Sequence, residues 1–68
     1  MDFESIEEKI LAYIKSRGEE PTATNDIIYA LKISYPTITK YLLVLEAKGK
    51  IRVSDQGNIK YYYAVQNA

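Results

Sequence analysis

The chain has 68 residues, contains no Cys and no His, and balances nine Lys and Arg residues against nine Asp and Glu residues. This length fits one small domain, and neither a disulfide nor a Cys/His zinc site can stabilise it. The N-terminus, Met-Asp-Phe-Glu, is unlike a signal peptide, and no apolar run approaches the roughly 20 residues that cross a membrane. We therefore expect a soluble, cytoplasmic protein with no membrane contact, no metal and no cofactor, for which a homodimer would add stability.

The charges are distributed unevenly along the chain. Residues 1–31 carry three cations and seven anions, a net charge of −4, whereas residues 32–68 carry six cations and two anions, a net charge of +4. This split predicts one acidic face and one basic face, although chance can produce it in so short a chain.

The first predicted element is a helix from about residue 2 to residue 17. Acidic residues occupy its first turns, Lys15 and Arg17 its last, and Gly18 ends it. Residues 21–24 favour extended backbone and form one short strand at most. Thr24 or Asn25 can then cap a second helix over residues 25–31. The apolar residues of the first helix recur at three- and four-residue steps: Phe3, Ile6, Ile10, Tyr13 and Ile14.

A third helix is predicted from residue 35 to residue 48, after a tight turn at Lys32-Ile33. The Ser34 hydroxyl can cap it by accepting from the Thr37 backbone N–H, Pro36 suits its first turn, and Gly49 follows its end. Residues 50–54 and 59–65 are predicted strands joined by a turn at residues 55–58. The element order indicates an α+β domain, mainly α, with two or three strands.

Residues 24–51 carry a pattern that resembles the helix-turn-helix of winged-helix transcription regulators, especially the compact bacterial and archaeal MarR-like and ArsR-like types. With the hairpin as the wing, the resemblance covers nearly the whole chain. It implies a three-helix winged helix-turn-helix that binds double-stranded DNA, but the lack of Cys and His excludes ArsR-type metal ligands. The matching features are Ile33-Ser34 before the third helix, Pro36-Thr37-Ile38-Thr39-Lys40-Tyr41-Leu42 within it, and Leu45-Glu46 followed by Gly49 and Ile51.

The third helix has two distinct faces when its residues are placed at steps of about 100°. The face opposite the core carries small, weakly polar side chains and almost no acidic ones, as a helix that enters the major groove requires. An ordinary solvated face is the alternative. The expected core stripe consists of Ile38, Tyr41, Leu42 and Leu45. The residues expected to bind DNA from this helix are Ser34, Tyr35, Thr37, Thr39 and Lys40.

Two adjacent apolar residues, Leu43 and Val44, fit this division poorly. Contact of Leu43 with the core, the first helix or a partner chain is favoured over contact with DNA. The first helix around Leu11 and the C-terminal strand are the surfaces through which two chains could pair.

The wing carries Arg52 and Lys60 on its two strands and Gln56 and Asn58 in its turn. In winged-helix proteins this hairpin often lies beside the DNA backbone, so the resemblance implies that these four residues bind phosphate. Asp55 would oppose such contact. The alternative is that the cations only keep the hairpin soluble.

Seven tyrosines are many for this length. Tyr61 and Tyr63 share a strand face with Ile59 and Val65 and are predicted to lie in the core, whereas Tyr62 points the other way and is a candidate contact residue. Packing is favoured over a stacking platform for single strands, which requires alternating exposed aromatics on an open sheet.

An enzyme is not expected, because the chain has no His, no Cys, no Gly-rich phosphate loop and no nucleophile-elbow serine. The preferred function is sequence-specific binding of double-stranded DNA by a transcription regulator. The alternative is a protein-interaction winged helix within a transcription or replication complex, which suits the zero net charge.

Overall fold

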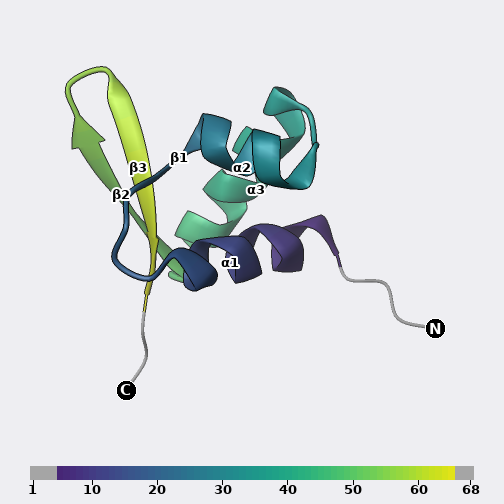
Figure 1. Ribbon diagram of the computed structural model, residues 1–68. Coiled ribbons are helices and arrows are strands. Elements are labelled where there is room, and N and C mark those ends of the chain that lie inside the picture. Colours follow the sequence, from purple (N-terminus) through teal and green to yellow (C-terminus); the bar gives the residue numbers. More distant parts are fainter. Residues whose placement is uncertain (1–4, 66–68) are drawn as a thin grey trace.

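A three-stranded antiparallel sheet packs against three helices in the computed structural model, which describes residues 5–65 (Figure 1). The expected α+β fold, mainly α, is therefore confirmed, and the sheet has three strands. Among residues 5–65, no helix is long and apolar enough to cross a membrane. The elements in chain order are α1 (Ile6–Arg17), β1 (Thr22–Ala23), α2 (Thr24–Leu31), α3 (Tyr35–Ala47), β2 (Ile51–Gln56) and β3 (Ile59–Ala64).

The helix α1 begins at a capping box. Ser5 has extended backbone, its hydroxyl accepts from the Glu8 N–H at 3.1 Å, and the Glu8 carboxylate accepts from the Ser5 N–H at 3.4 Å. These bonds satisfy two donors at the helix start. A helix running through Ser5 was therefore a wrong prediction, and its residues 2–4 lie outside the described residues. Gly18, at φ +64°, ends α1 as predicted.

The cap of α2 differs from the prediction. Ala23 occupies the N-cap position instead of Thr24 or Asn25, and the Asp26 carboxylate accepts from the Ala23 N–H at 3.1 Å. At its other end Lys32 adopts the left-handed conformation, with φ 58°, and makes the predicted tight turn into α3.

The helix α3 starts at the predicted residue, but the hydrogen bond made by the Ser34 side chain differs from the predicted one. Ser34 is the N-cap and Pro36 lies in the first turn. The Ser34 hydroxyl donates to the Thr37 hydroxyl at 3.0 Å, instead of accepting from the Thr37 backbone N–H. Gly49, at φ +76°, follows the helix end.

The strand β3 lies between β1 and β2. On one side of β3, Val53 and Ile51 of β2 pair with Tyr62 and Ala64, respectively. On its other side, Thr22 of β1 also pairs with Tyr62. Because side chains alternate along a strand, these five residues share one side of the sheet. That side faces the helices, since Ile51, Thr22 and Tyr62 are buried.

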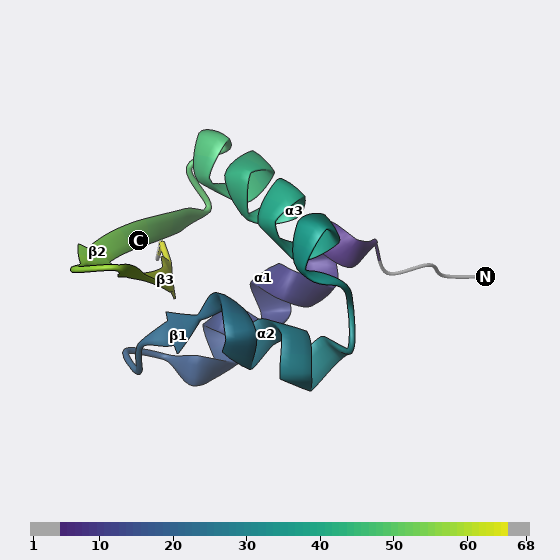
Figure 2. The ribbon, with the colours of Figure 1, turned by 90° about the horizontal axis from the view of Figure 1, so that it is seen from above.

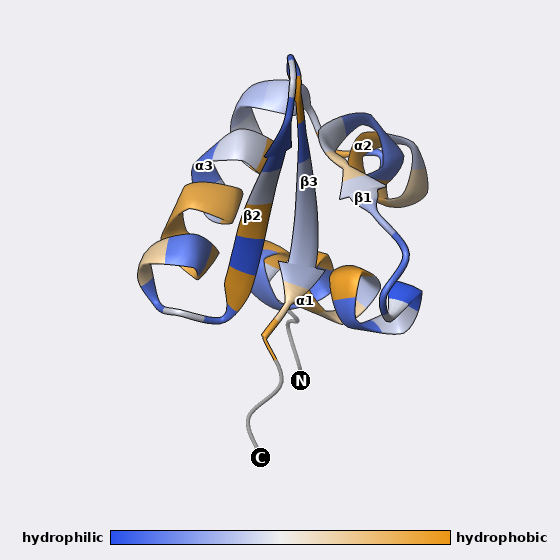
Figure 3. Ribbon diagram, turned by 90° about the vertical axis from the view of Figure 1, so that its left-hand side faces the viewer, coloured by the Kyte–Doolittle hydropathy of each residue, from blue (hydrophilic) through white to orange (hydrophobic). Residues whose placement is uncertain are grey.

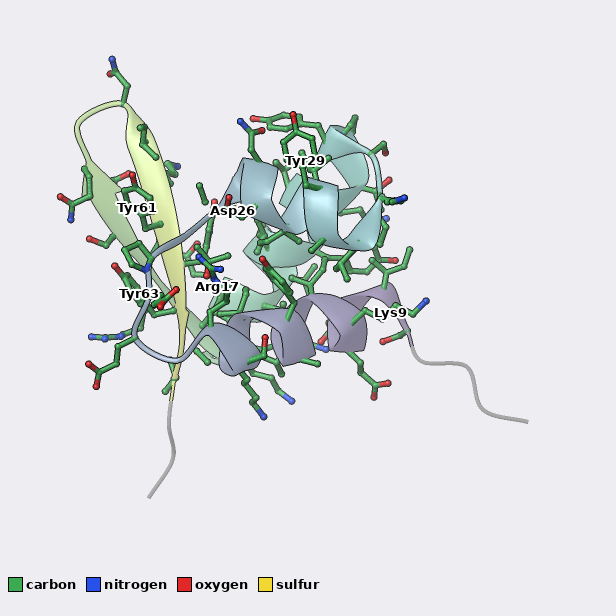
Figure 4. The ribbon with its side chains drawn as sticks, viewed as in Figure 1. Lys9, Arg17, Asp26, Tyr29, Tyr61 and Tyr63 are labelled. Carbon is green, nitrogen blue, oxygen red and sulfur yellow. The ribbon has the colours of Figure 1, made fainter. Side chains whose placement is uncertain are left out.

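The prediction for the tyrosines was therefore wrong. Tyr62 is 8% exposed and belongs to the core, whereas Tyr61 and Tyr63 lie half-buried on the outer side and Ile59 is 49% exposed. Figure 4 labels Tyr61 and Tyr63 along the sheet, to the left of the helices. The sequence of β3 is apolar or aromatic on both faces, so it does not by itself indicate which face packs against the helices. The pairing of Tyr62 with Val53 of β2 determines that face.

The core fills the space between the sheet and the helices. Figure 3 shows the sheet in front, with α3 and α2 on either side and α1 beneath. The predicted stripe of α3 is confirmed at Ile38, Leu42 and Leu45, and Tyr41 packs against it half-buried. The buried apolar side chains are Ile10, Ile14, Ile27, Ile38, Leu42, Leu45, Ile51 and Tyr62.

Two identical truncations test this core. Ile27→Val should lower the free energy of unfolding by about 0.5–1.5 kcal/mol, because Ile27 is fully buried and the change leaves a cavity. Ile59→Val removes the same methylene from a half-exposed position and should cost less than about 0.5 kcal/mol. Urea unfolding followed by circular dichroism measures both, and equal losses would contradict the arrangement of the core.

Candidate nucleic-acid interface

A cleft of about 520 Å³ lies between α3, the start of α2 and the wing formed by β2 and β3. Figure 2, the view from above, shows how α3, α2 and the strands of the wing are arranged relative to one another. None of the described residues that line the cleft is acidic, and Lys60 is its cation. Its lining residues are Ala23, Thr24, Asn25, Tyr35, Thr39, Leu43, Asn58, Ile59, Lys60 and Tyr62.

The helix α3 turns one row of residues outward beside this cleft. We call this row, made of Pro36, Lys40, Leu43 and Ala47, the outward row; all four residues are exposed and spaced by three or four positions. Leu43 is 68% exposed. The favoured expectation that Leu43 contacts the core or the first helix was therefore wrong within the described chain, whereas its neighbour Val44 is half-buried.

The residues predicted to read DNA from α3 do not all share one side of the helix. Tyr35 and Thr39 line the cleft, and Lys40 follows directly on the outward row. Thr37 lies about 160° around the helix from Thr39, on the side turned away from the wing. Ser34 precedes the helix and bonds to Thr37. The structure therefore groups Tyr35, Thr39 and Lys40, but not Thr37.

The hydroxyl hydrogens of Ser34 and Thr39, near the start of α3, already have acceptors. The Thr39 Oγ1 atom lies 3.1 Å from the carbonyl oxygens of both Tyr35 and Pro36, and it donates to this pair. The Ser34 hydroxyl donates to Thr37. Such local bonds leave a threonine its methyl group and its remaining lone pair for a ligand.

The Lys40 ammonium is exposed and lies 5.5 Å from the centre of the Tyr41 ring. Attraction to the ring is worth about 0.5–1 kcal/mol at such a site. Within residues 5–65 the ion pairs are Arg17–Glu20 and Glu7–Lys48, so no described carboxylate neutralises Lys40. Its charge is available to an anionic ligand.

Arg52 and Lys60, the two wing cations that were both predicted to bind phosphate, lie on opposite faces of the sheet. Arg52 lies opposite Tyr63, whereas Lys60 lies opposite Asp55. Alternation along the strands puts Arg52 and Lys60 on opposite faces of the hairpin. Arg52 instead lines a second cleft, near Gly18 and Tyr63. Lys60 is therefore the wing cation that faces α3.

The wing tip is tighter than predicted, because β2 continues through Asp55 and Gln56. The turn consists of Gly57 and Asn58, with a positive φ of +67° at Gly57 and not at Asn58, the pattern of a type II′ hairpin turn. The Gln56 amide donates to the Ser54 hydroxyl at 2.8 Å, on the side of Arg52. The turn therefore gives Asn58, and not Gln56, to the cleft.

The charges are more mixed in space than along the chain. The Lys48 ammonium lies 2.8 Å from the Glu7 carboxylate, which joins the basic second half to the acidic first half. Asp55 stands opposite Lys60 in the wing. The predicted separation into one acidic and one basic face is therefore incomplete, and the free cations near α3 are few.

Some residues of the cleft were not among the predicted binding residues. Thr24 and Asn25 were considered only as caps, Ile59 was expected in the core, and DNA contact by Leu43 was disfavoured. Leu43 follows Pro36 and Lys40 at steps of three and four residues along α3, and this spacing indicates that Leu43 is a surface residue. The approach of α2 to the wing has no local signal in the sequence.

Comparison with known proteins identifies a family. The model of the FaeA-like protein family matches residues 6–62, so the chain belongs to this family. No curated protein matches the chain. A solved structure, described as "Structural insights into the DNA recognition and protein interaction domains reveal fundamental homologous DNA pairing properties of HOP2", is similar over 90% of this chain and 100% of its own, with 25% identity and a TM-score of 0.80. The expected winged-helix fold is confirmed, whereas the MarR-like or ArsR-like affiliation stays a prediction.

A substitution at the wing tip tests the turn that positions Asn58. Gly57→Ala should lower the free energy of unfolding by about 1 kcal/mol, because φ +67° is strained for a residue with a Cβ. Beyond Gly57 and its two chain neighbours, no atom lies within 4 Å of the added Cβ, so the loss would come from the backbone conformation alone. Gln56→Ala, an exposed neighbour with ordinary φ, is the control in urea unfolding. A Gly57→Ala protein as stable as the parent would contradict the turn type.

Proposed function

We propose that this member of the FaeA-like family binds double-stranded DNA and serves as the sequence-specific DNA-binding unit of a transcription regulator. The observation that carries the proposal is the acid-free cleft between α3 and the wing, which combines Lys60 with amide and hydroxyl side chains. The description of the similar HOP2 structure, which names DNA recognition, supports it.

The dimensions of the elements suit this function. An α-helix with its side chains is about 10–12 Å wide and enters the major groove, which is about 12 Å wide. With α3 in the groove, the wing stands beside it, and the sugar-phosphate strand that borders the groove occupies the cleft. Lys60, Asn58 and Asn25 would then contact phosphate and fix the position of α3, and Lys40 would contact a second phosphate. Tyr35 and the apolar members of the outward row would face the bases.

The number of unpaired cations near the cleft determines how strongly salt should weaken DNA binding. Lys40 and Lys60 are the two cations beside the cleft, and two phosphate contacts give a slope of log affinity against log salt of about −1.8. One domain would therefore bind weakly. A homodimer that contacts two half-sites about one turn of DNA apart would strengthen the binding.

Charge variants test the proposal against a duplex selected from a random pool. Lys60→Ala should weaken binding about three- to tenfold in low salt and reduce the salt slope by about 1, and Lys40→Glu should abolish binding without unfolding the domain. Arg52→Ala, which removes a cation from the opposite face of the hairpin, is the matched control and should bind as the parent does. Fluorescence anisotropy measures the affinities; no detectable duplex binding in low salt would refute the proposal.

The pairing of Asp55 with Lys60 predicts a variant that gains affinity. Asp55→Asn removes the anion opposite Lys60 and keeps the size of the side chain, so duplex affinity should rise about two- to fivefold in low salt, with the gain fading as salt rises. Glu19→Gln, beside the second cleft, removes one negative charge far from Lys60 and is the control. If both variants gained equally, net charge and not the wing would govern binding.

A protein-interaction winged helix is the second candidate. The outer side of the sheet favours it, because Tyr61, Tyr63 and Arg52 lie there and no described helix covers that side. The HOP2 description also names protein interaction domains. The duplex titration decides between the two candidates, because a protein-interaction domain without DNA contacts would show no salt-dependent binding.

A further inference from the structure

The outward row of α3 offers few hydrogen-bond donors to the bases. Pro36, Leu43 and Ala47 are apolar, and Lys40 is its one charged member. Thr39, beside the row, already donates its hydroxyl hydrogen to the backbone of the first turn. Recognition of guanine commonly uses a bidentate Arg or Lys, and α3 contains no Arg and one Lys.

The same surface is well suited to an apolar group. Leu43 is 68% exposed, and it lines the cleft with Ile59, which is 49% exposed. The 5-methyl group of thymine is the apolar group that base edges present in the major groove. Burial of Leu43 against such methyl groups would remove apolar surface from water on both partners.

We propose that α3 selects A·T-rich duplexes through the 5-methyl groups of thymine, with Leu43 as the main contact and the Thr39 methyl beside it. The inference rests on the proposed function and names its target class. The lining of the cleft beside Leu43 suits a duplex, since Lys60 is cationic, none of the lining residues is acidic, and the Asn25 and Asn58 amides can donate to phosphate. An apolar protein partner would leave these polar groups unpaired.

Replacing thymine by deoxyuridine removes the methyl group and keeps the base pairing. In the selected duplex this replacement should weaken binding by about fourfold for each contacted methyl. Leu43→Ala should bind the thymine duplex about as weakly as the parent binds the deoxyuridine duplex, and should lose most of the difference between the two duplexes. Because Leu43 is exposed, the variant is expected to fold, and circular dichroism checks this.

Two controls separate methyl contact from other effects. Arg52→Ala, on the opposite face of the hairpin, should keep the parent's thymine-to-deoxyuridine ratio, and 5-methylcytosine placed at a cytosine that faces Leu43 should raise affinity. A selected site rich in G·C pairs, or equal binding of the thymine and deoxyuridine duplexes, would overturn the inference and leave the proposed function standing. Unchanged duplex affinity of Leu43→Ala would likewise overturn it and indicate a protein contact at Leu43. Failure to bind any duplex would instead refute the proposed function.

Discussion

The pairing of β2 with β3 determines most of what this domain presents to a partner. Tyr62 stands opposite Val53 and packs with the helices, so every second residue of β3 faces the same way. Lys60 thereby reaches the cleft beside α3, while Tyr61 and Tyr63 lie on the outer side. A slip of one residue would exchange these two sets and replace the polar cleft by a tyrosine surface.

The helix α3 is oriented by a comparable constraint. Ile38, Leu42 and Leu45 are 0–1% exposed, and burying this stripe fixes the rotation of the helix about its axis. The opposite side must then face outward, whatever its composition. An exposed Leu43 on that side is tolerated because a single apolar side chain in water costs little free energy.

The charges explain how a protein of zero net charge can have a surface for an anionic partner. Glu7 pairs with Lys48 away from the cleft, Asp55 stands opposite Lys60 on the wing, and no described carboxylate forms an ion pair with Lys40. Such a surface draws little affinity from phosphate alone, because long-range attraction depends on the sum of nearby charges. If the partner is DNA, as proposed, selective binding would then depend more on contacts between α3 and the bases than on contacts with the DNA backbone.

The sequence by itself determined the three helices, the wing and the stripe of α3, because apolar spacing of three and four residues allows only one buried face, and because glycines mark the turns. It also predicted Tyr35, Thr39, Lys40, Asn58 and Lys60 as binding residues; the structure places four of them around one cleft and leaves Lys40 exposed on the neighbouring outward row. The face of β3 was decided only by the tertiary structure, since Ile59, Tyr61, Tyr63 and Val65 compete with Tyr62 and Ala64 for burial. The separation of Arg52 from Lys60 followed from the same pairing, and the approach of α2 to the wing came from long-range packing. The local sequence does not predict these contacts, because they depend on which surfaces meet when the chain folds.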